Sequence, residues 1–143
     1  MTKDDVLQFL RGKRLAVIAT ADASGAPEAA LVGFAVTPDG RLIFDTSTNS
    51  RKASNLAARR EVAMVVGWDD EITVQIDGVA DRPSGVELAR AKEAYFAVWP
   101  DGRARENWPD IAYVVVTPHW LRYCSFAAGV EMIEFRLDKP AAR

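Results

Sequence analysis

The amino-acid sequence predicts a mainly β protein with flanking helices (α+β), built as an antiparallel barrel in a single domain of residues 1–143. Short apolar segments rich in β-branched residues recur along the chain, and turn residues separate them. Three segments instead have the apolar spacing of an amphipathic helix. No repeat or linker interrupts the chain, whose length suits one core. Because strands dominate, the simplest architecture is a closed or nearly closed barrel whose gaps the helices fill.

The first half of the sequence predicts one helix followed by a meander of strands. The helix covers Lys3–Arg11, with Thr2 as its N-cap and Gly12 as its stop. Two turns rich in Asp, Gly, Ser and Pro then separate three apolar segments. These segments are the predicted strands 15–21, 29–36 and 41–46. We expect each of them to pair antiparallel with the next.

The second half predicts two further helices, at 50–60 and 84–98. Glu87 follows Ser84 at the spacing of a capping box, and a loop rich in Pro, Gly and charge follows this helix. Pro118 is expected to end one strand before the next begins. The predicted strands are 61–68, 72–77, 111–117, 121–126 and 130–135. The tail from Asp138 is expected to fray.

The composition argues against several classes of function. The formal net charge of −2 provides no broad positive field for nucleic acid. No apolar run approaches the roughly 20 residues needed to cross a bilayer, so no membrane contact is expected. Cys124 is the only cysteine, and the N-terminus lacks a signal-peptide pattern, so we expect a cytoplasmic protein. With His119 as the only histidine, no metal site is expected.

The most informative segment is 44–52, which joins the end of a predicted strand to the start of a helix. It contains hydroxyl groups, an amide and a cap-type serine, Ser50, next to Arg51 and Lys52. The N-terminus of a helix carries positive dipole charge, so two cations there are unfavourable unless an anion lies nearby. A bound phosphate would supply that anion. A solvated helix start explains the same pattern, and this segment alone does not separate the two.

This segment resembles the FMN-binding segment of the pyridoxamine 5′-phosphate oxidase family. The resemblance includes Ser50-Arg51-Lys52, the following Asn55-Leu56-Ala57 and the apolar strand that ends at Trp68. It extends to Gly25-Ala26-Pro27 and Asp77-Gly78, which occur in the same order as in the family, and covers roughly residues 4 to 126. It implies a split antiparallel β-barrel of the FMN-binding type.

The resemblance also implies roles for individual residues. Arg51 and Lys52 would bind the FMN phosphate beside Ser50, while Thr46 and Ser47 would line the edge of the isoalloxazine ring. Thr73 and Gln75 would lie near the flavin, and Trp120 and Tyr123 would approach it from a partner subunit. The family's oxidases carry a phosphate-binding arginine on the second strand, where this chain has Ala30. The phosphate must therefore depend more on Arg51 and Lys52, or on another chain.

The expected function is that of an FMN-binding flavoprotein, an oxidoreductase that acts on a small molecule as a homodimer. No catalytic acid or base is assigned, because the flavin carries the hydride chemistry. The alternative is a non-catalytic protein that binds or carries flavin, deazaflavin (F420) or haem, and His119 is the residue that favours haem. We do not expect a pyridoxamine phosphate oxidase, because Ala30 replaces the arginine and residues 131–138 lack the histidine of the family's final segment.

Overall fold

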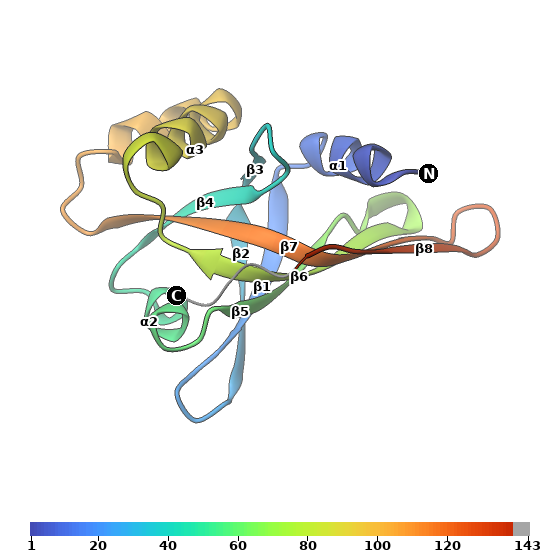
Figure 1. Cartoon of the computed structure of the whole chain (residues 1–143), viewed down its shortest axis with the longest axis horizontal. Helices are drawn as coiled ribbons and strands as arrows, with labels where there is room; N and C mark the ends of the chain where they lie inside the picture. Colours follow the sequence, from blue (N-terminus) through green and yellow to red (C-terminus); the bar gives the residue numbers. More distant parts are fainter. Residues whose placement is uncertain (139–143) are drawn as a thin grey trace.

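The computed structural model describes residues 1–138 and shows a curled antiparallel sheet with helices packed around it (Figure 1). The helices are α1 Lys3–Arg11, α2 Arg51–Ala58 and α3 Gly85–Val98, with short 3₁₀ segments η1 Asp69–Glu71 and η2 Pro100–Arg105. The strands are β1 Leu15–Ala21, β2 Pro27–Gly33, β3 Ala35–Val36, β4 Leu42–Ser47, β5 Glu61–Val66, β6 Ile72–Asp81, β7 Ile111–Ser125 and β8 Glu131–Arg136. The mainly β architecture with flanking helices is confirmed. The expectation of a frayed tail from Asp138 falls, after Asp138 itself, on residues 139–143, which lie outside the described residues.

The two ends of the sheet meet at a single residue. The strand order is β2-β1-β5-β6-β7-β4-β3, so β2 and β3 are the end strands, yet only Phe34 separates them in the chain. Phe34 is fully buried, and its carbonyl oxygen accepts a hydrogen bond of 3.0 Å from the Trp99 indole. A Cβ at Gly33 would lie 2.7 Å from the Trp99 ring, so the glycine permits this close approach. The chain therefore changes direction at 33–34 and closes the barrel.

The predicted meander is confirmed in its antiparallel pairings, but its middle strand is interrupted for the same reason. The single strand expected at 29–36 is two strands, β2 and β3, because Trp99 occupies the Phe34 carbonyl. β1 pairs with β2 as expected, but β4 pairs with β3 and β7 rather than with β2. The barrel is consequently closed by chain continuity rather than by a hydrogen-bonded ladder between β2 and β4.

One long strand, β7, replaces the two strands predicted on either side of Pro118. Gly78 pairs with Pro118 and Asp77 pairs with Trp120, so His119 is an extra residue in a β-bulge. A bulge tolerates proline, which has no N–H to give to a ladder. Before the bulge β7 pairs with β4, and after it with β8, while β6 pairs with β7 on both sides of the bulge, from Val115 to Ser125. The sheet divides at this point.

The sheet packs against helices on both of its sides. The interior of the barrel is filled by a large apolar cluster to which α1 contributes Val6 and Leu10. A second cluster joins α3 to the outer side of β3, β4 and β7. Figure 1 shows this helix at the top of the molecule, above β4. The predicted capping box of α3 is wrong: within residues 1–138 the Ser84 side chain makes no capping bond, and Glu87 instead accepts a hydrogen bond of 2.8 Å from Arg41. The predicted N-cap of α1, Thr2, is confirmed.

Candidate functional site

The predicted anion site lies where β4 passes into α2. Ser50 is the N-cap of α2, and its Oγ accepts a hydrogen bond of 3.2 Å from the Ala53 N–H. The Thr46 and Ser50 hydroxyl oxygens lie 3.0 Å apart and share a hydrogen bond. Ser47 donates a hydrogen bond of 2.7 Å to Asp110, which fixes the loop before the helix. The structure thus brings Thr46, Ser47 and Ser50 together in an ordered strand-to-helix junction.

Arg51 and Lys52 line a small pocket of about 230 Å³ beside this junction. The opposite wall consists of inward-facing residues of β1 and β2, among them Thr20 and Ala30. The position at which the family's oxidases carry an arginine therefore faces the same pocket as the two cations. The complete lining is Ile18, Thr20, Glu28, Ala29, Ala30, Arg51 and Lys52.

A carboxylate that the sequence analysis overlooked lies in this pocket. Glu28 is on β2, and its side chain is only 15% exposed. One carboxylate oxygen, Oε2, forms an ion pair with Arg51, and the other accepts a hydrogen bond of 2.9 Å from the Asn55 amide. Asn55 is buried and also donates a hydrogen bond of 2.9 Å to Thr20. A buried charge requires such partners, because it has lost its contact with water.

The sequence does contain a signal for this residue. Val32 and Ala30 face the interior from β2, and side chains on one face of a strand recur every second residue. Glu28 continues that series, so the strand pattern places a charged residue on the inward face. The partner of the charge could not be predicted, because Arg51 and Asn55 belong to a helix more than 20 residues further along the chain.

The remaining predicted residues do not join this pocket within one chain. Gln75 and Trp120 line a separate hollow of about 340 Å³ with Val17 and Val65. Val17 and Ile18 point to opposite faces of β1, so the two hollows lie on opposite sides of the sheet. Thr73 pairs with Cys124 of β7. Tyr123 is buried in the core, where its ring packs edge-on against Phe9 at 5.8 Å between centroids.

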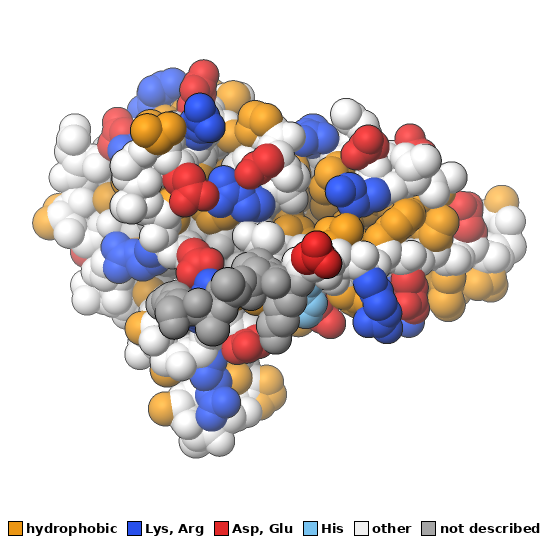
Figure 2. All heavy atoms as spheres, viewed as in Figure 1, with side chains coloured by type: hydrophobic (Ala, Val, Ile, Leu, Met, Phe, Trp, Pro, Cys, Tyr) orange, Lys and Arg blue, Asp and Glu red, His pale blue; other side chains and the backbone are white. Residues whose placement is uncertain are grey.

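The outer face of the sheet is apolar and exposed. Register places Leu31, Val17 and Val65 side by side across β2, β1 and β5, followed by Gln75 on β6. Leu31 is 60% exposed and Leu15, on the same face, is 41% exposed. On the face shown in Figure 2, by contrast, acidic and basic side chains are interspersed and no patch of one sign forms.

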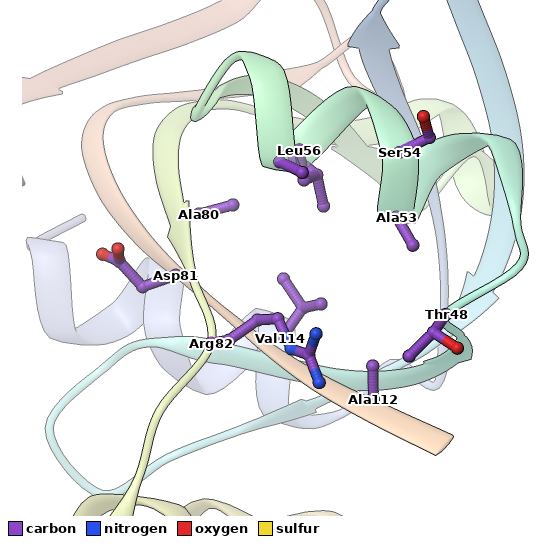
Figure 3. A pocket seen from close by; sticks show the side chains of 10 residues that line it. Thr48, Ala53, Ser54, Leu56, Ala80, Asp81, Arg82, Ala112 and Val114 are labelled. Atoms are coloured by element: carbon purple, nitrogen blue, oxygen red, sulfur yellow. The ribbon is translucent and has the colours of Figure 1, made fainter. Parts of the chain in front are cut away.

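A larger cavity, of about 580 Å³, lies on the other side of α2. Small and apolar side chains from α2, β6 and β7 point into it, and the Arg82 side chain extends toward Val114 (Figure 3). Its size is within the usual range for small-molecule sites. No local sequence pattern predicts this cavity, because its walls come from three distant segments of the chain. The lining is Thr48, Ala53, Ser54, Leu56, Ala57, Ala80, Asp81, Arg82, Ala112 and Val114.

A charged cluster joins β4 to α3 and η2. The Tyr95 hydroxyl donates a hydrogen bond of 3.0 Å to Asp45, and Arg105 forms an ion pair with the same carboxylate at 2.9 Å. Burial raises the pKa of Tyr95, and the negative charge of Asp45 raises it further. The hydrogen bond that Arg105 donates to Asp45 likewise raises the pKa of Arg105. Arg105 is thus held within the fold by Asp45 rather than free for a ligand.

His119 lies in the β7 bulge, where its carbonyl oxygen accepts a hydrogen bond of 2.9 Å from the Leu137 N–H. Residues 1–138 contain no group of three or more His, Cys, Asp or Glu side chains arranged to hold a metal ion. In the same part of the chain, none of the helices has the length and apolar character to span a membrane.

A curled sheet that divides at β7, with a cation-lined pocket at a strand-to-helix junction, defines a split-barrel domain with a candidate anion site. The model of the family described as "Pyridoxamine 5'-phosphate oxidase" matches residues 2–125. The chain belongs to this family.

Individual relatives resemble parts of the chain. The pyridoxine/pyridoxamine 5′-phosphate oxidase of Bordetella avium is 35% identical over 92 residues, which are 64% of this chain and 42% of the relative. The Streptomyces avermitilis enzyme of the same name is 33% identical over 93 residues and is matched over 40% of its length. The chain thus spans less than half the length of these curated relatives.

Solved structures share the fold at low sequence identity. A heme binding protein from Mycobacterium smegmatis has a TM-score of 0.82 at 19% identity, over 92% of this chain and 56% of the other. A pyridoxamine 5′-phosphate oxidase-related, FMN binding protein from Nostoc punctiforme has a TM-score of 0.69 at 13% identity, over 95% and 96% of the two chains. At these identities the likeness establishes the split-barrel fold alone, and the implied split barrel is confirmed.

Proposed function

We propose that this chain is a cytoplasmic FMN-binding flavoprotein, an oxidoreductase that acts on a small molecule as a homodimer. The single observation that carries the proposal is the pocket at the start of α2, where Arg51 and Lys52 lie beside the hydroxyl of Ser50. Membership of the family and the FMN-binding neighbour from Nostoc punctiforme support the same cofactor.

The donor set of this pocket fits a phosphate group. A guanidinium and an ammonium group supply positive charge, and the N–H groups of the first turn of α2 have no partners within the helix. Arg51 offers a planar fork and Lys52 a point charge, a combination suited to a phosphomonoester. Riboflavin, which lacks the phosphate, would gain nothing from these groups.

When bound, the flavin would supply hydride transfer, and the chain would supply binding and orientation. Arg51 and Lys52 would bind the phosphate, and Thr46 and Ser47 would contact the ring edge from the end of β4. Hydrogen bonds hold the junction between β4 and α2, so the Thr46 and Ser47 hydroxyls would be positioned before the ligand arrives. No side chain of the chain is assigned as a proton donor or acceptor in the reaction.

The homodimer is supported by the exposed outer face of the sheet. A soluble protein rarely leaves a continuous apolar face uncovered, and Leu31 and Leu15 are exposed there beside Val17. A second copy that packs on this face would bring Gln75 and Trp120 into the interface, as expected for residues that complete a pocket across two chains.

Haem binding is the second candidate, with the chain as a carrier rather than an enzyme. The supporting observations are the Mycobacterium smegmatis heme binding protein at TM-score 0.82 and the presence of His119 on the β7 bulge. A histidine ligand to the iron would be His119, the only histidine of the sequence. Hemin titration of the wild-type chain and of His119→Ala tests this: a Soret band that His119→Ala removes would favour haem over FMN. A deazaflavin such as F420 would use the same cations as FMN.

The double variant Arg51→Ala, Lys52→Ala tests the proposed site. Each charge-assisted hydrogen bond contributes about 1.5–3 kcal/mol, but Arg51 must first leave Glu28. We therefore expect FMN to bind roughly 10- to 100-fold more weakly, with riboflavin binding unchanged. The control is Lys3→Ala, Arg90→Ala, which removes the same charge elsewhere. Unaltered FMN affinity in the double variant would show that the phosphate site is assigned wrongly.

A further inference from the structure

We propose that Glu28 is an internal counter-ion that occupies the anion site and sets its affinity for phosphate. A phosphate-bearing ligand binds only as the Glu28 carboxylate gives up Arg51. The inference deepens the proposed function, on which it rests for the identity of the ligand as FMN. The competition between Glu28 and an anion does not depend on that identity.

The Glu28 carboxylate lies in the pocket that the two cations line. Glu28 pairs with Thr20 across β2 and β1, and both side chains face the pocket that Arg51 and Lys52 line. The Glu28 Oε2 atom is buried, and its ion pair is with the Arg51 guanidinium. The carboxylate therefore neutralises Arg51 from the buried side of the pocket that a phosphate would enter.

The buried amide of Asn55 fixes the orientation of the Glu28 side chain. Asn55 is 5% exposed and donates hydrogen bonds of 2.9 Å to both Thr20 and Glu28. Only one carboxylate oxygen of Glu28 is held in this way, which turns the other toward Arg51. The two partners differ in burial: the Glu28 side chain is 15% exposed and that of Arg51 is 83% exposed. Arg51 is therefore the partner that can move, while Glu28 stays in place.

Glu28 also balances positive charge at the N-terminus of α2. Two cations at the N-terminus of α2 require an anion, because the helix dipole already makes this end positive. Glu28 is that anion in the structure, so the conflict that suggested a phosphate is already relieved. Lys52 lines the pocket and has no ion pair with any of residues 1–138, so the cluster of Glu28, Arg51 and Lys52 keeps a net charge of only +1.

A consequence for specificity follows from this charge. An incoming phosphate dianion must compete with a carboxylate for Arg51 and is also repelled by it. Small free anions such as inorganic phosphate offer no further contacts to offset that cost, so they bind poorly. A phosphomonoester with a large apolar body can offset it through the rest of the molecule. Glu28 is thus a specificity-determining residue that excludes small anions from the cofactor site.

Glu28→Gln tests the inference with inorganic phosphate as the probe. The glutamine retains an oxygen that can accept the Asn55 hydrogen bond and removes only the charge. Calorimetric titration in phosphate-free buffer should show inorganic phosphate binding about tenfold or more tighter than in the wild type. Glu93→Gln, which removes an equal charge from an exposed site on α3, should leave phosphate binding unchanged.

Further measurements separate the inference from the proposed function. FMN should bind Glu28→Gln more tightly by a similar factor, while riboflavin should not, and adding Arg51→Ala should abolish the gain. If Glu28→Gln does not fold, Glu28→Ala serves in its place. Equal phosphate binding in the wild type and the variant, including none in either, overturns the inference, as does a gain that survives Arg51→Ala. A gain for phosphate without FMN binding in either protein upholds the role of Glu28 and contradicts the flavin assignment.

Discussion

The Tyr95 hydroxyl of α3 donates a 3.0 Å hydrogen bond to the Asp45 carboxylate of β4, at a site where the tyrosine is 3% exposed. This bond joins the outer helix to the barrel strand that leads into the candidate site. Tyr95→Phe removes the donor and leaves one carboxylate oxygen less satisfied, so unfolding should become easier by about 1–3 kcal/mol in urea. Tyr113→Phe is the matched control: its hydroxyl is buried without a hydrogen-bond partner among residues 1–138, so its loss should cost little. A larger cost for Tyr113→Phe would contradict this account.

The same tyrosine predicts a loss of stability in alkali. Burial, followed by the charge of Asp45, raises the pKa of Tyr95 above its ordinary value of 10.0. The folded protein then keeps this proton at a pH at which the unfolded chain loses it. The contribution is complete below about pH 10 and declines as the pH rises further. The thermal midpoint should therefore fall above pH 10, and it should fall less in Tyr95→Phe, as scanning calorimetry across pH 8 to 11 would reveal.

Gly78 lies at the point where the sheet divides, and any side chain there should destabilise the fold. A Cβ there would lie 2.6 Å from Val116 Cγ1 and 2.9 Å from the Thr117 carbonyl oxygen. Gly78→Ala should thus reduce the free energy of unfolding by about 1–3 kcal/mol, because β6 and β7 must move apart. Gly12→Ala is the control, since its nearest neighbour would be 3.5 Å away. Equal stability of the two variants in a urea titration would argue against the tight β6–β7 contact.

The proposed homodimer should depend on Leu31. Light scattering should give about twice the chain mass for the wild type, and Leu31→Glu should yield monomers because it buries a charge in the apolar contact. Val86→Glu changes a comparably exposed residue on α3 and should leave the mass unchanged. A wild-type monomer that retains flavin would contradict the proposal that the pocket is completed across two chains.

The FMN-loaded protein should not oxidise pyridoxamine phosphate at an appreciable rate. A substrate phosphate requires accessible cations, yet Arg105 is paired with Asp45, and Lys92 with Glu106. Ala30 also stands where the family's oxidases carry an arginine. Incubation with pyridoxamine phosphate and oxygen, followed by assay of pyridoxal phosphate, should show negligible product. Turnover on the order of 1 per second or faster would refute this.

The sequence predicted those parts of the fold that depend on local pattern. The bounds of β1 were predicted to the residue, because its short apolar run and flanking turn are local features. The division of β7 at Pro118 was wrong, since a proline is compatible with a strand once a bulge at His119 is available. That bulge depends on register with β6, which no single segment encodes.

The candidate site could be predicted only where its residues are close together in the sequence. The residues from Thr46 to Lys52 are close in sequence, and the structure joins Thr46 to Ser50 by a hydrogen bond while Arg51 and Lys52 line the adjacent pocket. Glu28 was missed because its partners lie on another element. The contacts of Gln75 and Trp120 with a flavin stay a prediction, because they require a second chain.

The central claim is that this chain holds a flavin by its phosphate, and titrating the wild-type protein with FMN and with riboflavin tests it most directly. The two ligands share the ring and differ in the group that Arg51 and Lys52 would bind. Quenching of flavin fluorescence should show FMN binding roughly 10- to 100-fold more tightly than riboflavin, with one site per chain. Equal affinities for the two ligands, or no binding of FMN, would contradict the account.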